Sequence, residues 1–416
     1  MQKQGISRRT FVASSAGAFA ALMGLYGCSG SSASGSASSA ASASASGSAS
    51  SSVSASSFAV DVEELDESWM IIEEKADGSR VMNDTLGEIT VPKESFRIAC
   101  TAPAHTSGLL LLGAVDKIVA IDQSFANGGW ILSKYPQLSK VPVVFANNET
   151  NVEELLNQKP DLVTYATRYG EDTLKQLQEL GIVCSGGMKQ ANDDGLDFLD
   201  RVRDNAAYYG LVIGGPQATA AKNFREEFAA IRKAIEARTA GIAEKDKPTV
   251  CEVSSAGQQL QVNNGSAIGQ MLIELAGGIN AAKDAAGESA GPSGQTIIEP
   301  ETLLNYNPDI LIIDKAGYLD ELKNDSVLSQ LKAIKENRVF VAPTGAMSWP
   351  YNGPEEYLNM YFFAKCIQPD LFEDVDLEEE TKKFYKTYFG FDLTADDIKQ
   401  IFALADGQKV ADIFKK

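Results

Sequence analysis

A pattern of short helix, polar-Pro-Asp turn and apolar strand occurs twice in this chain, and it constrains the fold more than any other feature. In the first copy, Lys159-Pro160-Asp161 leads from a predicted helix into a strand at 162–166. In the second copy, Asn307-Pro308-Asp309 leads in the same way into a strand at 310–313. Alternating helices and apolar strands predict parallel sheets with helices on both faces. The repetition predicts two lobes of similar build.

Further elements continue this alternation through both halves of the chain. A short hairpin is expected at 82–92, ahead of the first buried strand. The remaining predicted strands lie at 97–100, 117–121, 182–184, 249–253 and 339–342, and the predicted helices at 107–114, 152–158, 171–180, 267–275 and 301–306. The strands are short, apolar and bounded by Gly, Pro or polar residues, which is typical of buried strands in parallel sheets.

The segment 216–243 predicts one long helix between the two halves. It has no proline after Pro216, which suits a first helical turn. Apolar residues follow at three- and four-residue spacings, namely Phe224, Phe228, Ile231 and Ile235. Such an amphipathic helix spans about 40 Å at about 1.5 Å per residue. We expect a rigid spine at 214–245 that joins an N-terminal lobe (58–213) to a C-terminal lobe (246–416). The alternative is a helix contained within one lobe.

The first residues predict export and a lipid anchor. Arg8 and Arg9 precede an apolar stretch of about 15 residues, shorter than the roughly 20 needed to span a bilayer. Paired arginines at this position resemble a twin-arginine export signal, and the small residues before Cys28 are similar to a lipobox. A Ser/Ala/Gly-rich segment then predicts a flexible tether. We therefore expect a signal peptide at 1–27, lipidation of Cys28, a linker over 28–57, and an extracytoplasmic protein anchored to the cell membrane.

Charge and residue content exclude several classes of function. The formal net charge is −19, and an acidic surface disfavours nucleic acid and anionic lipid headgroups as partners. The single histidine, His105, excludes a bare divalent metal held by several imidazoles. The sequence has neither a nucleophile elbow nor a phosphate loop, so we do not expect an enzyme. Four further cysteines show no metal-ligand spacing and leave a Cys100–Cys184 disulfide open.

Four segments in a fixed order carry a family resemblance. They are Arg97-Ile98-Ala99 through Gly113-Ala114-Val115-Asp116-Lys117-Ile118-Val119-Ala120, then 151–163, then Leu275-Ala276-Gly277-Gly278-Ile279-Asn280 with 301–309, and finally 343–372. Together they resemble the substrate-binding proteins of ABC importers for iron chelates, haem and corrinoids, and the last segment is similar to a subgroup associated with iron complexes. The resemblance covers nearly all of the mature chain. It implies an α/β fold of two Rossmann-like lobes, with parallel sheets, joined by one long rigid helix.

The resemblance also implies partners. A member of this family holds its ligand between the lobes and docks on a membrane permease that a cytoplasmic ATPase drives. Many relatives carry a glutamate after the first loop that forms a salt bridge with the permease. Here Ser107-Gly108 stands near that position, which leaves the N-terminal docking contact unassigned. Glu299 or Glu301 would serve in the C-terminal lobe.

Candidate ligand-binding residues lie in the loops beyond the carboxyl ends of the predicted strands, where ligands bind in sheets of this kind. They are His105, Trp130, Arg168, Tyr169, Gln259, Met347, Trp349 and Tyr351. The aromatic members offer flat apolar surface to a chelate or macrocycle, and Arg168 can pair with an anionic group. If the ligand is haem, His105 or Tyr169 would be its axial ligand. We expect no other direct metal ligand.

The predicted function is therefore ligand capture for transport. We expect no intrinsic cofactor, and we expect the bound ligand to be an iron chelate, either a siderophore or haem. The alternatives within the same fold are a corrinoid and a molybdate-like oxyanion. An alternative of another class is a chelatase-like extracytoplasmic enzyme, in which His105 would be the candidate base.

Overall fold

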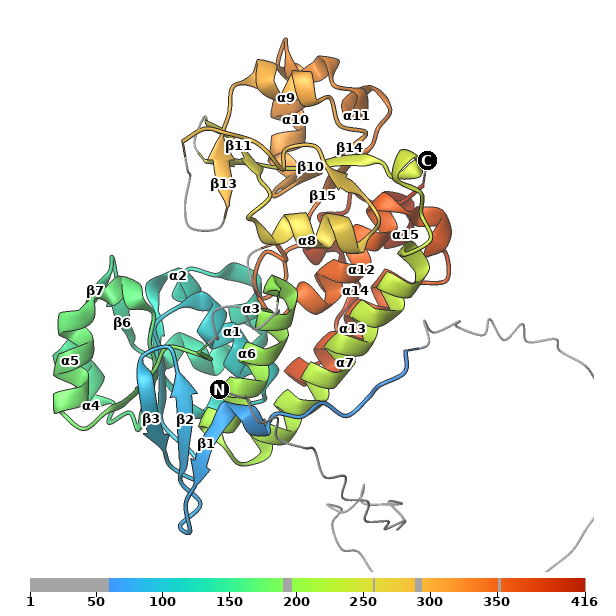
Figure 1. The fold of residues 1–416 in the computed structure, drawn as a ribbon. Helices are drawn as coiled ribbons and strands as arrows, with labels where there is room; N and C mark the ends of the chain where they lie inside the picture. Colours follow the sequence, from blue (N-terminus) through green and yellow to red (C-terminus); the bar gives the residue numbers. More distant parts are fainter. Residues whose placement is uncertain (1–59, 190–196, 257–258, 289–293, 351–352, 416) are drawn as a thin grey trace, which may run out of the picture. The chain divides into compact units, whose positions relative to one another are not determined.

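The computed structural model describes residues 60–189, 197–256, 259–288, 294–350 and 353–415, which belong to one compact unit formed by 55–416 (Figure 1). The predicted signal peptide, Cys28 and the linker lie outside the described residues. The domain boundaries proposed from the sequence stay predictions. The predicted hairpin is confirmed: β1 (Ile71–Glu74), β2 (Arg80–Asp84) and β3 (Gly87–Val91) form an antiparallel sheet in that order.

The N-terminal lobe is built on a sheet with the strand order β7-β6-β5-β4-β8-β9. Its strands are β4 (Ile98–Cys100), β5 (Ile118–Asp122), β6 (Val143–Ala146), β7 (Glu149–Thr150), β8 (Leu162–Thr164) and β9 (Val183–Ser185). Its helices are α1 (Pro103–Leu111), α2 (Gln123–Ala126), α3 (Gly129–Lys134), α4 (Val152–Asn157) and α5 (Glu171–Glu179). These strands pair in parallel except β7, which is antiparallel to β6. The alternation read from the sequence is thus confirmed in this lobe.

The C-terminal lobe has a mixed sheet rather than a parallel one. Its strand order is β13-β11-β10-β14-β15, with β12 also paired to β10. The strands are β10 (Thr249–Ala256), β11 (Gln259–Asn263), β12 (Ile279–Asn280), β13 (Gln295–Ile297), β14 (Ile310–Ile313) and β15 (Val339–Val341). The pairs β10–β11 and β11–β13 are antiparallel. Only residues 257 and 258 separate β10 from β11, and so short a connection joins strands only in an antiparallel hairpin.

Helices complete the C-terminal lobe and the end of the chain. They are α8 (Ile268–Leu275), α9 (Pro300–Tyr306), α10 (Ala316–Asn324), α11 (Lys332–Lys335), α12 (Glu356–Ile367), α13 (Leu377–Phe384), α14 (Ala395–Ile401) and α15 (Val410–Ile413). A π-helical turn follows α13 at Tyr385–Phe389. This turn packs against α1 of the N-terminal lobe, so the end of the chain contacts both lobes.

The predicted spine is present as α7 (Pro216–Thr239), which has 24 residues and is shorter than the sequence suggested. Its partner α6 (Phe198–Ile213), which the sequence analysis missed, runs alongside it (Figure 1). Gly210 allows this close packing, because a Cβ there would lie 2.2 Å from the Cβ of Ala221. The helix ends where the Thr239 hydroxyl donates to the Leu275 carbonyl, 2.9 Å away, which ties the spine to α8.

One hydrophobic core runs through the spine. The apolar residues predicted for α7, from Phe224 to Ile235, are at most 1% exposed. They belong to a core cluster that also contains Ile98 of β4 and Ile312 of β14, one from each lobe. Two smaller clusters cover the opposite face of each sheet. Because the same packed core reaches both sheets, we expect the spine to be stiff.

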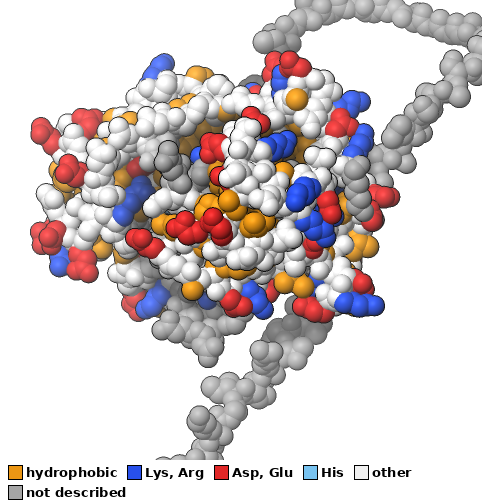
Figure 2. Space-filling view, turned by 90° about the horizontal axis from the view of Figure 1, so that it is seen from above, with side chains coloured by type: hydrophobic (Ala, Val, Ile, Leu, Met, Phe, Trp, Pro, Cys, Tyr) orange, Lys and Arg blue, Asp and Glu red, His pale blue; other side chains and the backbone are white. Residues whose placement is uncertain are grey.

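The outer surface is polar but not uniform. On the face seen in Figure 2, acidic side chains gather near the middle beside hydrophobic ones, and basic side chains lie to either side. Among the helices that the structure describes, none combines the length and the hydropathy needed to cross a bilayer. The four cysteines beyond the N-terminal segment are buried and free, which leaves the Cys100–Cys184 disulfide unformed.

Candidate functional site

The strand order of the N-terminal sheet creates a switch point between β4 and β8. From β4 the chain proceeds to β5 and β6 on one side, and it then returns to place β8 and β9 on the other. Ligands of such sheets bind beyond the carboxyl ends of the strands where the order reverses. Thr101 follows β4, Thr164 ends β8, and both are fully buried at this edge. The switch point is therefore lined by polar groups.

His105 sits at this edge in a fixed orientation. Its Nδ1 lies 3.1 Å from the Thr164 carbonyl oxygen. A carbonyl only accepts hydrogen bonds, so Nδ1 carries the proton and Nε2 keeps its lone pair. Burial lowers the pKa of His105 to about 4, and the Arg168 cation acts in the same direction. At neutral pH the imidazole is uncharged and can accept a hydrogen bond or ligate a metal through Nε2.

Arg168 and Tyr169 occupy a short 3₁₀ helix, Thr167–Tyr169, directly after β8. Both donate to Oδ2 of the buried Asp122, which ends β5: the guanidinium at 2.9 Å and the phenol at 2.8 Å. Arg168 also donates to the Thr101 carbonyl at 2.8 Å. These bonds link the ends of three adjacent strands, β5, β4 and β8. The Arg168 side chain is nevertheless 41% exposed, whereas Tyr169 is 4% exposed.

A cavity of about 960 Å³ runs between α1 and α6. His105 and Leu109 line it from α1, and Asn205 and Tyr209 line it from α6. The segment after β9, residues 186–189, forms another wall. Gly353 and Pro354 contribute from the C-terminal lobe. Most of the wall therefore comes from the N-terminal lobe and its adjoining helix.

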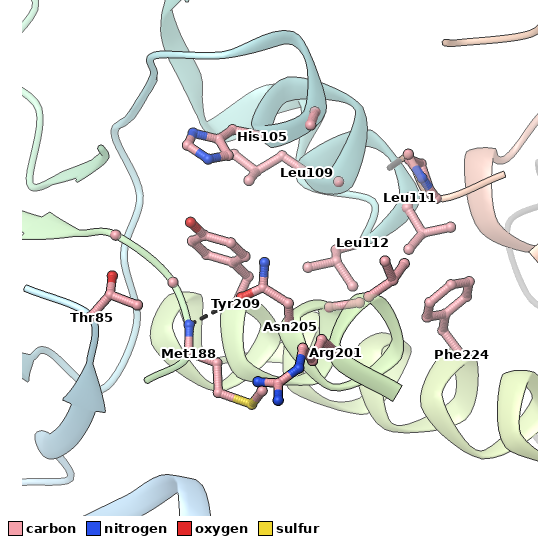
Figure 3. A pocket seen from close by; sticks show the side chains of 18 of the residues that line it. Thr85, His105, Leu109, Leu111, Leu112, Met188, Arg201, Asn205, Tyr209 and Phe224 are labelled. Carbon is pink, nitrogen blue, oxygen red and sulfur yellow. Dashed lines mark hydrogen bonds between the residues drawn. The ribbon is translucent and has the colours of Figure 1, made fainter. Parts of the chain in front are cut away.

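The two ends of the cavity differ in chemistry. Figure 3 shows His105, Tyr209 and Thr85 toward one end, and Leu111, Leu112 and Phe224 toward the other. Asn205 stands beside Tyr209, and its Oδ1 accepts a hydrogen bond from the Met188 amide at 3.0 Å. The Tyr209 hydroxyl is buried and makes no hydrogen bond within the described chain. We call these the polar end and the apolar end.

Of the residues predicted from the sequence, His105 lines this cavity. It was placed in a loop, but it lies in the first turn of α1, because Pro103 starts the helix earlier than expected. Arg168 and Tyr169 lie beside it at the strand edge. Gln259 is exposed at the start of β11 and not in a loop. The hairpin geometry of β10 and β11 explains that difference.

The predicted tryptophans are packed into the protein. Trp130 lies on α3, is 8% exposed, and donates from Nε1 to Asp397 Oδ1 at 2.7 Å. Trp349 is fully buried against Phe362 and Phe402. Neither ring offers a free face to a ligand in this conformation. The Trp130 ring instead packs between N-terminal and C-terminal elements, and the Trp349 ring packs among the C-terminal helices.

Met347, another predicted residue, lies in the loop after β15. Met347 is half-buried and neighbours Gly353 of the cavity wall, where a Cβ would lie 3.3 Å from the Met347 Cβ. Tyr351 lies outside the described residues. The amide of Met347 donates to Oε1 of the buried Glu355 at 3.2 Å. Burial raises the pKa of that carboxyl to about 7.

Sequence reasoning missed several residues of the cavity wall. Arg201, Asn205 and Tyr209 come from α6, and Thr85 comes from the hairpin turn between β2 and β3. The i, i+4, i+8 spacing of the three α6 residues places them on one helical face, and this was the available signal. Thr85 gave no such signal. Among the described residues, no group of three or more His, Cys, Asp or Glu side chains is arranged to hold a metal ion.

Comparison with known proteins agrees with this architecture. A family model described as periplasmic binding protein matches residues 98–345. The molybdate-binding protein MolA of Haemophilus influenzae is 23% identical over 327 residues, covering 74% of this chain and 91% of MolA. The iron(3+)-hydroxamate-binding protein YxeB of Bacillus subtilis is 22% identical over 269 residues, covering 63% of this chain and 77% of YxeB.

Solved structures show the same fold. The crystal structure of a periplasmic solute binding protein from Veillonella parvula superposes with a TM-score of 0.67 and 27% identity, covering 78% of this chain and 97% of that one. The matched family range extends from β4 to the loop after β15, so it contains the sheets of both lobes and the spine. The chain therefore belongs to the periplasmic binding protein family, as the substrate-binding component of an ABC importer rather than an enzyme.

Proposed function

We propose that this protein captures an iron chelate, with its organic shell in the cavity between α1 and α6, and delivers it to a permease. The observation that carries the proposal is a cavity of about 960 Å³ with one polar and one apolar end. Pockets that enclose organic ligands measure about 300–1,000 Å³. The volume is thus suited to a chelate or a macrocycle and far exceeds the needs of a bare ion.

The charges of the wall favour an anionic or oxygen-rich ligand. Lys189 and Arg201 line the cavity, and its described lining contains no Asp or Glu. Arg168 adds a partly exposed guanidinium at the adjacent strand edge. Carboxylates and other chelator oxygens are the groups that such cations and hydroxyls bind. The apolar end then contacts the hydrocarbon part of the same ligand.

If the chelate is haem, His105 is the better of the two predicted axial ligands. Its Nε2 keeps a lone pair and the residue lines the cavity. Tyr169 instead donates its hydroxyl to Asp122 and is 4% exposed. The Tyr169 ring packs against Phe145 in the core of the lobe. Haem ligation by this protein would therefore depend on His105.

A molybdate-like oxyanion is the second candidate. The relationship to MolA and the two cations of the cavity wall favour it. A small oxyanion would bind at the polar end and leave the apolar end unused. The presence of Leu111, Leu112 and Phe224 in the same cavity is the reason that we rank the iron chelate first.

Membrane attachment and docking belong to the same proposal. Lipidation at Cys28 would hold the protein beside its permease and ATPase. Ser107, near the position of the missing docking glutamate, is fully buried and offers no surface group. Glu299 and Glu301 are exposed at the start of α9. We propose that this side of the C-terminal lobe supplies an acidic docking contact.

Binding titrations test the proposal directly. The purified protein is titrated separately with a ferric trihydroxamate, haemin, cobalamin and molybdate, and affinity is followed by calorimetry and by the shift in melting temperature. We expect an iron chelate or haemin to bind most tightly. Tight binding of molybdate, with no response to any chelate or tetrapyrrole, would replace the first candidate with the second.

Matched variants identify the contact to haem. If haemin binds, His105→Ala should abolish the shift of the Soret band, because it removes the free Nε2. Tyr169→Phe should leave the band unchanged, since it removes only a hydroxyl already donated to Asp122. A Soret shift that survives in His105→Ala and disappears in Tyr169→Phe would reverse the assignment of the axial ligand.

A further inference from the structure

We infer that the N-terminal hairpin β2–β3 is a wall of the ligand cavity and that Asp84 positions it, so that this hairpin sets which chelates fit. The inference rests on the proposed function. The hairpin lies before residue 98, outside the range that the family model matches.

The hairpin turn reaches the cavity directly. Thr85 lines the polar end together with Gly186 and Gly187. Its amide donates to the Gly187 carbonyl at 3.0 Å, and the Lys189 amide donates to the Asn83 carbonyl at 3.1 Å. These backbone bonds extend the hairpin along the segment after β9. That segment and the hairpin turn thus form one continuous wall.

Gly186 permits the close approach of the two segments. A Cβ at this position would lie 2.3 Å from Thr85 Oγ1 and 2.8 Å from Leu86 Cγ. Any side chain here would push the hairpin turn away from the wall. The contact is consequently tight enough for the turn to hold a defined position.

Asp84 joins the three pieces that surround the polar end. The side chain is fully buried. Its Oδ1 accepts from the amides of Leu86 and Gly186, both at 2.9 Å. Its Oδ2 accepts from the Ser185 hydroxyl at 2.7 Å and from the Tyr208 hydroxyl at 2.8 Å. A carboxylate only accepts hydrogen bonds, and this one accepts from these four groups and, at 3.4 Å, from the Thr85 hydroxyl. The hairpin, the segment after β9 and α6 are thereby all bonded to the Asp84 carboxylate.

This arrangement determines what the ligand meets. Tyr208 precedes Tyr209, whose hydroxyl is buried at the polar end and makes no bond among the described residues. Ser185 donates its hydroxyl to Asp84 and does not line the cavity. The carboxylate of Asp84 is behind the wall and does not line the cavity. The ligand therefore meets the Tyr209 hydroxyl, which can donate to a chelator oxygen, and the Thr85 hydroxyl, which donates to Asp84 Oδ1 at 3.4 Å and can still accept from the ligand.

The ligand test uses paired variants of the full chain. Thr85→Val removes the hydroxyl from the wall, and Thr90→Val makes the same change at an exposed position on β3. With the ferric trihydroxamate or haemin, whichever the wild type binds, Thr85→Val should weaken binding about five- to tenfold, the effect of one lost hydrogen bond. Thr90→Val should change it less than about twofold. Equal affinities for Thr85→Val and the wild type would overturn the role of the turn.

The positioning role of Asp84 has a measure of its own. Asp84→Asn should speed hydrogen exchange at the amides of 186–189, because the carboxyl oxygen that accepts from Ser185 and Tyr208 is replaced. Asp204→Asn is the control. It alters a different buried carboxylate, which lies on α6 and is bonded to Arg203 and Arg225, and it should leave exchange at 186–189 unchanged. Unaltered exchange in Asp84→Asn would overturn the positioning role.

These readouts separate failure of the inference from failure of the proposed function. If no chelate binds the wild type, the proposed function is rejected, while exchange at 186–189 still decides the role of Asp84. If a chelate binds, Asp84→Asn should also alter the ratio of its affinity to that for molybdate, measured well below the melting temperature. A merely destabilising change would lower both affinities in proportion and leave that ratio constant.

Discussion

The sheets of the two lobes carry buried carboxyl groups of opposite character. In the N-terminal lobe, buried Asp122 at the end of β5 accepts from Arg168, Tyr169 and the Ser124 amide. In the C-terminal lobe, Glu252 on β10 is 8% exposed, and its Oε2 makes no hydrogen bond with the described chain. Burial raises the pKa of Glu252 to about 7, and neighbouring Asp314 adds to the shift.

This difference teaches that similar local patterns do not produce similar chemistry. Both lobes alternate helix and strand, and both bury a carboxyl group on a strand of their sheet. Asp122 has a cation and a hydroxyl as partners, whereas Glu252 Oε2 has no hydrogen-bond partner among the described residues. We therefore expect Asp122 to organise the binding edge of the N-terminal sheet, whereas Glu252 in the C-terminal lobe makes stability depend on pH.

The largest loss of stability should come from removing the Asp122 carboxylate. Asp122→Ala leaves the Tyr169 hydroxyl buried without an acceptor, breaks the pair with Arg168, and removes the cap of α2. We expect the free energy of unfolding to fall by about 4 kcal/mol, measured by chemical denaturation at pH 7. Exposed Asp116 provides the control, because Asp116→Ala should be nearly neutral. A loss for Asp122→Ala as small as that of the control would erase the contrast between the lobes.

A pH-dependent gain in stability should follow from neutralising the Glu252 side chain of the C-terminal lobe. The pKa of Glu252 is about 7 in the folded protein, against an ordinary value of 4.5. Between these pH values the folded state holds a proton that the unfolded chain releases, so stability falls as pH rises from about 4.5 to 7. Glu252→Gln should raise the free energy of unfolding by up to about 3 kcal/mol at pH 8 and leave it unchanged at pH 4.

Denaturation of the same variant at both pH values checks this sign. Glu274→Gln, at an exposed position of α8, serves as the control and should show no difference between pH 4 and pH 8. Glu355, whose pKa burial also raises to about 7, should keep part of the pH dependence in Glu252→Gln. An equal effect of Glu252→Gln at both pH values would mean that its ionisation does not control stability.

The smallest loss of stability should come from replacing Arg168, the half-exposed partner of Asp122. Arg168→Met removes the ion pair, but Asp122 keeps its bonds from Tyr169 and Ser124. Because the Arg168 side chain is 41% exposed, solvent screens the pair and the loss of stability should stay below about 1 kcal/mol. Lys175→Met breaks an exposed pair with Glu171 and should cost no more. A cost near that of Asp122→Ala would show that the cation, rather than the carboxylate, organises the edge.

Much of the fold was accessible from the sequence, and less of the site. Apolar runs such as 310–313 and the spacing of Phe224 and Phe228 report local burial, and both predictions are confirmed. Aromatic residues were harder to assign. Trp349 follows a strand, as a ligand contact would, yet it is fully buried among helices that lie later in the chain. Composition does not reveal whether a ring faces a cavity or a core.

By itself, the sequence determined the alternation of helix and strand, the two lobes and the spine, because the spacing of apolar residues along a helix or strand is a local property. Only the tertiary structure decided that Thr85, His105 and Tyr209 surround one cavity, since they come from a hairpin, a first helix and a later helix. The role of Asp84 was equally hidden. Three of its donors lie 101 to 124 positions away in the chain, and only folding brings them within hydrogen-bonding distance.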